Sequence, residues 1–396
     1  MRICFYLEYK ELTGGYTNLI LTLLKELYFS KTPVLLFNYK NGLIDRELKK
    51  QDININIIDL DEINWNEIDQ IIFPSDVLVI TSFLEIFKNF FQVNPITVYY
   101  DINMLLPQIS SYKYGFKFYF LGKKLIDNLL AQKSLIFMDH LGVEGINRVF
   151  RQTVSEPIYL PIPVYVPTQN FFIKKDNQAN DEVLNLTYVG RSVVWKMKPL
   201  KKIIEDCVDI SNTVSIHIYI VVDNIVEFKK FIDLDYYKAK CKLTFSLFEN
   251  LLPAELDEFI KSKSDIHFAM GTAALDAAKH GIPTVLLDFS YKNFPTDYTY
   301  RWMYESTGFG IGKLLEENVV AKGVPIGVVI NSIKQNNGMI IHSSNCYNHV
   351  NNYHSVKKIV PELINACKEA KFRIRDAKNL VPYYFKFHRF LKKYFS

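Results

Sequence analysis

The chain has 396 residues, of which 49% are hydrophobic and 22% are charged, and its net charge is +5. This length exceeds what one ordinary hydrophobic core accommodates, so we expect two α/β domains of about 150–200 residues each. An aromatic content of 14% excludes intrinsic disorder as a description of the whole chain.

Strand and helix signals alternate through the first half of the chain. A helix is expected over residues 16–29, where Leu19, Leu23 and Leu27 recur on one face, and Gly14 and Gly15 make the turn before it. Such alternation indicates βαβ units and a parallel sheet. The expected strands are Ile3–Leu7, Val34–Phe37, Asn54–Ile58, Val77–Ile80, Ile96–Tyr100 and Leu135–Met138.

The pattern breaks where three prolines precede a polar stretch, and a second alternating series then begins. Its expected strands are Leu184–Val189, Val214–Val222, Leu243–Phe245, Ile266–Phe268 and Thr284–Leu287. We therefore predict an α/β chain with two Rossmann-like domains that face each other across a cleft, followed by a C-terminal helical segment. The expected boundaries are 1–170 for the first domain, 171–182 for the linker, 183–355 for the second domain and 356–396 for the C-terminal helices.

The segment SDIHFAMGTAALDAAKHGIPTVLLD, residues 264–288, is the first candidate binding motif. A buried strand reaches Gly271-Thr272 and passes into a helix, and a glycine at a helix start lets a phosphate approach the backbone. Thr272 and Asp276 share a helix face, so the carboxylate of Asp276 can accept from sugar or ribose hydroxyls. In a purely structural reading, Gly271 and Thr272 cap the helix and Asp276 favours its positive end.

Basic residues follow the strand Leu184–Val189. Gly190-Arg191 ends that strand, and Lys196 and Lys198 come next. This arrangement suits a diphosphate, because guanidinium and ammonium groups neutralise charge that builds on a leaving group. The other reading is a set of solvated basic side chains on a loop.

Both segments resemble those of a known family. YVGRSVVWKMK is similar to the Gly-Arg…Lys element that opens the donor domain of GT-B glycosyltransferases, especially the retaining family 4. LDAAKHGIPTVLLD resembles that family's helix–Gly–x–Pro–strand signature, and the Gly14-Gly15 turn resembles its glycine-rich acceptor-side loop. The likeness covers most of the chain in architecture, but only these segments in motif.

The resemblance implies roles for individual residues. Arg191 and Lys196 would bind the donor diphosphate and act in catalysis, with Lys198 as a second choice, and Asp276 stands where the family has a ribose-binding Glu. The family usually has another Glu earlier in this motif, and this chain has Phe268 at that position. The donor site implied in this way comprises Gly190, Arg191, Lys196, Lys198, Gly271, Thr272 and Asp276.

On the acceptor side, Asp101 follows the strand Ile96–Tyr100 at a position where relatives often carry His. Its carboxylate is the candidate general base for an acceptor hydroxyl, and the other reading is a loop Asp that caps local backbone. His140, Glu11, Gly14 and Gly15 are the further acceptor-side candidates.

Two basic-aromatic segments indicate a membrane surface as a partner. Residues 112–124 mix aromatic residues with four lysines, and residues 371–396 hold eight basic residues and one acid among aromatics. Such segments fit the interface of an anionic membrane, although their aromatic residues can instead pack on the protein. Nucleic acid is not an expected partner, because no recognised binding module surrounds the tail.

The expected location is the cytoplasm, including the cytoplasmic face of the inner membrane. No apolar run reaches about 18 residues, so no transmembrane helix is expected. The N-terminus enters a strand at once, which leaves no room for a signal peptide. Five scattered cysteines without metal-ligand spacing are typical of a reducing compartment.

We predict transfer of a sugar from a nucleotide-sugar to a hydroxyl of a glycan, free or lipid-linked, in bacterial surface polysaccharide or lipopolysaccharide synthesis. No metal or other cofactor is expected, because no Asp-x-Asp motif stands on a suitable loop, and the resemblance favours retention over inversion of the anomeric centre. A nucleotide-sugar epimerase of the same fold and a non-catalytic scaffold are the alternatives. The absence of Gly-x-Gly-x-x-Gly after either first strand disfavours a nicotinamide dehydrogenase.

Overall fold

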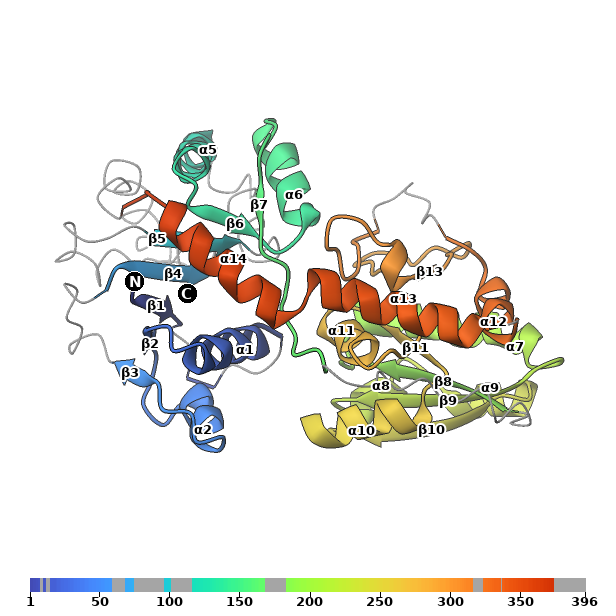
Figure 1. Ribbon diagram of the computed structural model, residues 1–396. Coiled ribbons are helices and arrows are strands. Elements are labelled where there is room, and N and C mark those ends of the chain that lie inside the picture. Colours follow the sequence, from blue (N-terminus) through green and yellow to red (C-terminus); the bar gives the residue numbers. More distant parts are fainter. Residues whose placement is uncertain are drawn as a thin grey trace. The chain divides into compact units, whose positions relative to one another are not determined.

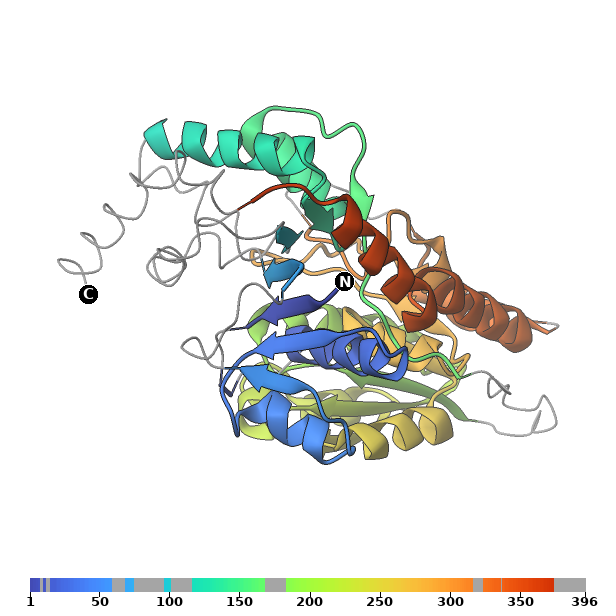
Figure 2. The ribbon, with the colours of Figure 1, turned by 60° about the vertical axis from the view of Figure 1, so that its left-hand side comes forward.

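The computed structural model describes residues 1–7, 10–11, 15–58, 68–74, 96–100, 116–167, 183–315, 323–335 and 337–373. The chain divides into two compact units, and the elements of each can be followed in Figure 1 and Figure 2. Unit 1 contains Met1–Pro163 and the chain from Val356 onward, and unit 2 contains Val164–Ser355. The expected strand Val77–Ile80 and the linker 171–182 lie outside the described residues.

Unit 1 is built on a parallel sheet with the strand order β3-β2-β1-β4-β5-β6-β7. Its strands are β1 (Ile3–Tyr6), β2 (Val34–Phe37), β3 (Asn56–Ile58), β4 (Gln70–Pro74), β5 (Ile96–Tyr100), β6 (Leu135–Phe137) and β7 (Ile158–Tyr159). Its described helices are α1 (Gly15–Phe29), α2 (Leu43–Lys49), α5 (Phe116–Ala131), α6 (His140–Phe150) and α14 (Val356–Glu369). The strands β4 and β7 were not among those expected from the sequence.

The helix α14 completes the core of unit 1. Its apolar face, which includes Val356, Ile359 and Leu363, belongs to the same buried cluster as Leu23 and Leu27 of α1. The side chain of Gln70 on β4 also donates a hydrogen bond to the carbonyl of Cys367 on α14. The C-terminal segment therefore closes the hydrophobic core that the first half of the chain begins.

Unit 2 is built on a second sheet with the order β10-β9-β8-β11-β12-β13. Its strands are β8 (Val183–Val189), β9 (Ser215–Val222), β10 (Thr244–Glu249), β11 (Ile266–Ala269), β12 (Thr284–Leu286) and β13 (Arg301–Trp302). All neighbours are parallel except β12 and β13, which are antiparallel. The described helices are α7 (Val194–Ile210), α8 (Ile225–Lys229), α9 (Leu234–Lys240), α10 (Pro253–Lys263), α11 (Thr272–Ala278), α12 (Ile326–Lys334) and α13 (Gly338–Tyr353).

The first unit ends at Pro163, ahead of the boundary at 170 that was expected from the proline-rich stretch. The backbone N–H of Val164 donates to the carbonyl of His354 at 2.7 Å, and Val164 forms a β-bridge with Ser355. The hydroxyl of Tyr347 donates to the carbonyl of Pro167 at 2.8 Å. These bonds attach residues 164–167 to the C-terminal part of unit 2.

Among the described residues, no helix is both long enough and apolar enough to cross a membrane.

A buried ion pair holds the antiparallel strand β13 against the end of β12. The carboxylate of Asp288 accepts from both terminal guanidinium nitrogens of Arg301, at 2.5 and 2.6 Å, and from the backbone N–H of Lys313 at 2.8 Å. Asp288 is 1% exposed and Arg301 7% exposed. Such a pair needs both partners, because either charge alone would be buried without compensation.

We expect Arg301→Met to lower the free energy of unfolding of unit 2 by roughly 3 kcal/mol, since it leaves the Asp288 carboxylate buried and unpaired. Urea unfolding followed by tryptophan fluorescence measures this change, because Trp302 is next to the substituted residue. The control is Lys261→Met, which removes an ion pair with the exposed Glu258 and should change stability by about 0.5 kcal/mol or less. Equal losses in the two variants would contradict the structural role of the buried pair.

Candidate functional site

The strand order of unit 2 reverses direction at β8. This strand lies between β9 and β11, so the chain continues to one side after β8 and later builds outward on the other side. In the pairing of β8 with β11, Tyr188 is opposite Phe268, so both strands reach the same edge at their carboxyl ends. Open parallel sheets bind ligands outside the carboxyl ends of their strands at such a reversal. Gly190-Arg191 and Gly271-Thr272 both follow this edge.

A buried polar cross-link joins β8 and β11 beneath that edge. The hydroxyl of Thr187 is 2.7 Å from Nδ1 of His267 and 2.6 Å from the hydroxyl of Ser264. Burial lowers the pKa of His267 to about 3, so its imidazole is neutral at physiological pH. These residues hold the two strands together, and the buried His267 is not a candidate general acid or base.

Gly190 makes room for the ring that positions the first turn of α7. A Cβ atom at this position would lie 2.4 Å from Oη of the buried Tyr188. That hydroxyl donates to the carbonyl of Lys196 at 2.9 Å. The glycine that the sequence indicated as a phosphate-loop residue is therefore required by the packing of Tyr188 beneath it.

The loop that carries Arg191 is braced by the end of β9. The backbone N–H of Ser192 donates to Oδ1 of Asp223 at 2.6 Å, and the Ser192 hydroxyl donates to the carbonyl of Asn224 at 2.7 Å. Arg191 itself is exposed. Asp223 was not among the site residues predicted from the sequence, although an acid directly after a buried strand at the carboxyl edge is a recognisable signal.

Lys196 is a mostly buried cation in the first turn of α7. Burial lowers its pKa to about 8, and the nearby charge of Arg191 adds to this effect. Its ammonium lies 5.2 Å from the centre of the Trp195 ring. The nearby charge of Asp223 acts in the opposite direction and raises this pKa, but less strongly. Within the part of the chain that the structure describes, this ammonium forms no hydrogen bond or ion pair, so an anion bound at the edge would add a bonded counter-charge.

Lys198 has a different environment, although it is only two residues away. Its ammonium donates to the carbonyls of Ser290 at 3.4 Å and Tyr291 at 3.3 Å, and also to that of Lys292. Lys198 therefore holds the loop after β12, and its ammonium is already engaged by these carbonyls, so it is not a candidate anion ligand.

Gly271 and Thr272 form the turn between β11 and α11. Gly271 has φ 68° and ψ −147°, a conformation that only glycine adopts readily, and a Cβ built there would meet nothing within 4 Å. Its N–H donates to the carbonyl of Ile311 at 2.7 Å, so this group is not available to a ligand. Thr272 is the first residue of α11.

The carboxylate of Asp276 is held by a neighbouring lysine. The ammonium of Lys279 lies 3.0 Å from Asp276 and 3.0 Å from Asp257 of α10, and thereby joins α10 to α11. The Asp276 side chain remains 32% exposed. It can still accept a hydrogen bond from a ligand, but as a member of an ion-paired cluster.

Phe268 stands at the position where the resemblance places an additional Glu. Its side chain is 1% exposed and packs edge-on against Tyr300, with 6.0 Å between the ring centres. The residue belongs to the core of unit 2, so no carboxylate projects from this point of β11.

The acceptor-side candidates in unit 1 lie on separate elements. Both oxygens of Glu11 accept from the Arg46 guanidinium on α2, at 3.0 and 2.7 Å, and this bonding lowers the pKa of Glu11. His140 begins α6, and its Nε2 is 3.8 Å from Glu144 one turn along that helix. Gly15 begins α1, while Gly14 and Asp101 lie outside the described residues.

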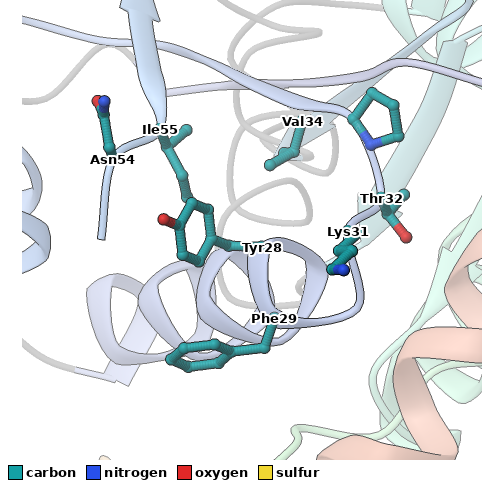
Figure 3. Close-up of a pocket in the computed structure, with 8 residues that line it drawn as sticks. Tyr28, Phe29, Lys31, Thr32, Val34, Asn54 and Ile55 are labelled. Atoms are coloured by element: carbon teal, nitrogen blue, oxygen red, sulfur yellow. The ribbon is translucent and has the colours of Figure 1, made fainter. Parts of the chain in front are cut away.

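A separate cavity of about 530 Å³ opens in unit 1, at the end of α1 and the start of β2 (Figure 3). It lies at the amino ends of the strands, away from the carboxyl edge, and none of the predicted site residues lines it. Its lining residues are Tyr28, Phe29, Lys31, Thr32, Pro33, Val34, Asn54 and Ile55. Within the described ranges, no group of three or more His, Cys, Asp or Glu residues is arranged to hold a metal ion.

No protein-family model matches this sequence, and no curated protein is significantly similar to it. Several solved structures nevertheless share its fold along almost the whole chain. The HepE protein of Anabaena in complex with UDP is 14% identical with a TM-score of 0.59, and the match covers 93% of this chain and 100% of HepE. A glycosyltransferase from Rickettsia africae is 11% identical with a TM-score of 0.60, covering 93% and 98% of the two chains.

The lipopolysaccharide outer core galactosyltransferase WaaB is 12% identical with a TM-score of 0.54, and the match covers 92% of this chain and 99% of WaaB. These similarities, together with the two parallel sheets of Rossmann-like order, confirm the predicted fold class. The chain is an α/β protein with the GT-B fold.

Proposed function

We propose that this protein is a glycosyltransferase that moves a sugar from a nucleotide-sugar donor to a hydroxyl of a glycan. The observation that carries the proposal is the Lys196 ammonium, which lies mostly buried beside Arg191 at the carboxyl edge of unit 2 and bonds no anion among the residues that the structure describes. A donor diphosphate is an anion of the right charge for this edge. The fold, shared with HepE in its UDP complex, supports the same ligand class and makes UDP the first nucleotide to test.

In the proposed reaction, the bond between the anomeric carbon and the diphosphate oxygen breaks, and the acceptor oxygen forms a new bond to that carbon. The acceptor proton passes to a base, for which Asp101 remains the candidate, and the nucleoside diphosphate leaves. Arg191 and Lys196 stabilise the charge that develops on the leaving diphosphate. We propose that these two cations make a bound metal unnecessary, with retention at the anomeric centre, and that Gly271, Thr272 and Asp276 contact the donor.

The acceptor and the location are also part of the proposal. We propose a glycan acceptor, including a lipid-linked one, in bacterial surface polysaccharide or lipopolysaccharide synthesis, and the likeness to the galactosyltransferase WaaB supports this class. Residues 112–124 and 371–396 are the proposed contacts with the cytoplasmic face of the membrane.

One observation favours a second candidate function, a non-catalytic scaffold. Phe268 is buried where the resembled family has a Glu, so a group associated with turnover in that family is missing. Binding of a nucleotide-sugar without transfer or hydrolysis across a panel of glycan acceptors would support the scaffold.

The first test measures thermal stabilisation of the protein by UDP, GDP, ADP, CMP and dTDP. A nucleotide present at 100 times its dissociation constant should add about 2.7 kcal/mol to the free energy of unfolding. We expect one nucleotide to raise the melting temperature of the wild type and to lose this effect in Arg191→Ala. Lys198→Ala is the matched control, and it should keep most of the shift because Lys198 bonds loop carbonyls. No shift with any nucleotide would refute the proposed donor site.

The affinity for that nucleotide should depend on pH through Lys196. Below its pKa of about 8 the side chain is an ammonium that attracts the diphosphate, and above it the charge is lost. The dissociation constant should therefore increase by up to about tenfold per pH unit between pH 8 and 9.5. Titration calorimetry at several pH values measures this slope. Lys196→Arg should abolish it, because an arginine stays charged throughout this range; an unchanged slope would show that another group titrates.

Lys196 should also lower the free energy of unfolding when no nucleotide is bound. Its pKa is about 8 in the folded protein instead of the ordinary 10.5, so folding disfavours the charged form below pH 8. We expect Lys196→Met to raise the free energy of unfolding at pH 7 by up to about 3 kcal/mol, and this gain should shrink between pH 8 and 10.5. The same variant should lose the nucleotide-induced shift. A variant that is destabilised and still binds would contradict this assignment.

A further inference from the structure

Three aromatic rings gather next to Lys196 at the carboxyl edge of unit 2. Trp195 belongs to the first turn of α7, while Phe289 and Tyr291 belong to the loop after β12. The ring centres are 5.0 Å apart for Trp195 and Phe289, 5.9 Å for Trp195 and Tyr291, and 5.6 Å for Phe289 and Tyr291. We call these three side chains the aromatic wall.

The aromatic wall has an exposed face. Tyr291 is 60% exposed, whereas Trp195 and Phe289 are partly buried and pack on the core of unit 2. Because it adjoins two further rings, this exposed ring extends an apolar surface that a ligand can cover. The two inner rings fix the outer one by edge-to-face contact.

The loop beneath Tyr291 is held in place by polar bonds. The Lys198 ammonium donates to the carbonyls of Ser290, Tyr291 and Lys292. The Ser290 hydroxyl donates to the carbonyl of Asn293 at 3.2 Å and accepts from the N–H of Lys292 at 3.1 Å. These bonds fix the backbone from which the exposed ring projects, which reduces the conformational entropy that is lost when a ligand binds to it.

The neighbouring charge indicates which part of a ligand covers the rings. The Lys196 ammonium lies 5.2 Å from the centre of the Trp195 ring, so a diphosphate at Lys196 would be adjacent to the aromatic wall. In a nucleotide-sugar the pyranose is attached directly to the diphosphate, whereas the ribose separates the base from it. Of the pyranose and the base, the pyranose is therefore the ring that lies nearer to the diphosphate. The C–H face of a pyranose is apolar and slightly positive, and it complements the negative face of an aromatic ring.

We infer that the aromatic wall binds the pyranose ring of the sugar nucleotide, with Tyr291 as the stacking residue and Lys198 as the residue that positions its loop. This inference rests on the proposed function, because it needs a donor diphosphate at Arg191 and Lys196. It places the sugar on the β12 side of the edge and directs the nucleoside toward β9 and β10, where Asp223 follows β9 and Glu249 ends β10.

The test compares binding of UDP and UDP-glucose to the wild type and to Tyr291→Ala by titration calorimetry. If the panel above selects another nucleotide, that diphosphate and its glucose derivative replace the pair. We expect Tyr291→Ala to weaken UDP-glucose binding about tenfold and to leave UDP binding unchanged, and Tyr291→Phe to behave like the wild type. Lys198→Met should weaken UDP-glucose selectively in the same way, through its loop.

The matched control is Tyr236→Ala. Tyr236 is also exposed, at 50%, and also lies against a lysine, with the Lys240 ammonium 3.9 Å from its ring centre. It belongs to α9, which leads into the amino end of β10, so its loss should change neither affinity. Trp195 provides a second readout, because UDP-glucose should quench tryptophan fluorescence more strongly than UDP does, and Trp195→Phe should remove this difference.

Each other outcome has a defined meaning. Equal losses of UDP and UDP-glucose affinity in Tyr291→Ala would place the nucleoside on the ring and overturn the inference. Unchanged affinity for both ligands would overturn it as well. A wild type that binds neither nucleotide nor nucleotide-sugar would refute the proposed function itself, and the aromatic wall would lose its assigned ligand with it.

Discussion

The proposed site depends on the burial of the Lys196 ammonium. This group is mostly buried, and it bonds no anion in the part of the chain that the structure describes. A buried cation normally recruits a carboxylate or loses its proton, and here burial already lowers its pKa to about 8. The nearby carboxylate of Asp223 accepts from the backbone N–H of Ser192, so it braces the loop instead of bonding the lysine. The ammonium therefore has no bonded anion among the described residues, and the hydrophobic core of unit 2 must offset the free-energy cost of its burial.

The fold keeps this cation in place through a few buried polar contacts between neighbouring elements. Tyr188 packs against Gly190, and its hydroxyl donates to the carbonyl of Lys196, so the first turn of α7 cannot shift without disturbing the core. Thr187 and His267 join β8 to β11 beneath the edge. On the far side, the Asp288–Arg301 pair anchors the start of the loop that carries Phe289 and Tyr291. A rigid edge of this kind binds a charged ligand with little reorganisation.

Much of the architecture could be predicted because parallel strands that are buried on both faces leave apolar runs between polar turns. The expected strands at 34–37 and 96–100 match β2 and β5 in full, and the second series is recovered with shifts at its ends. The strand β4 was missed because Gln70 and Pro74 flank a short apolar run, and Gln70 is buried only because it bonds Cys367 of α14. The two-residue strand β13 gave no signal, because it depends on pairing with β12. Such contacts join residues that are far apart in the chain, and no local pattern records them.

For the candidate site, the residue types alone indicated the groups at the carboxyl edge: a glycine and an arginine after one strand, lysines in the next turn and a glycine before a helix. It did not distinguish Lys196 from Lys198, because both lie near the start of the same helix and both are ordinary lysines. The two lysines differ only once the chain is folded, because Lys198 then bonds loop carbonyls while Lys196 bonds no anion within the described ranges. The same holds for Asp276, which Lys279 clamps to Asp257 of another helix, and for Phe268, which the core absorbs. The physical reason is that residue type fixes a side chain's charge and hydrogen-bonding groups, whereas burial and distant partners fix whether those groups are available.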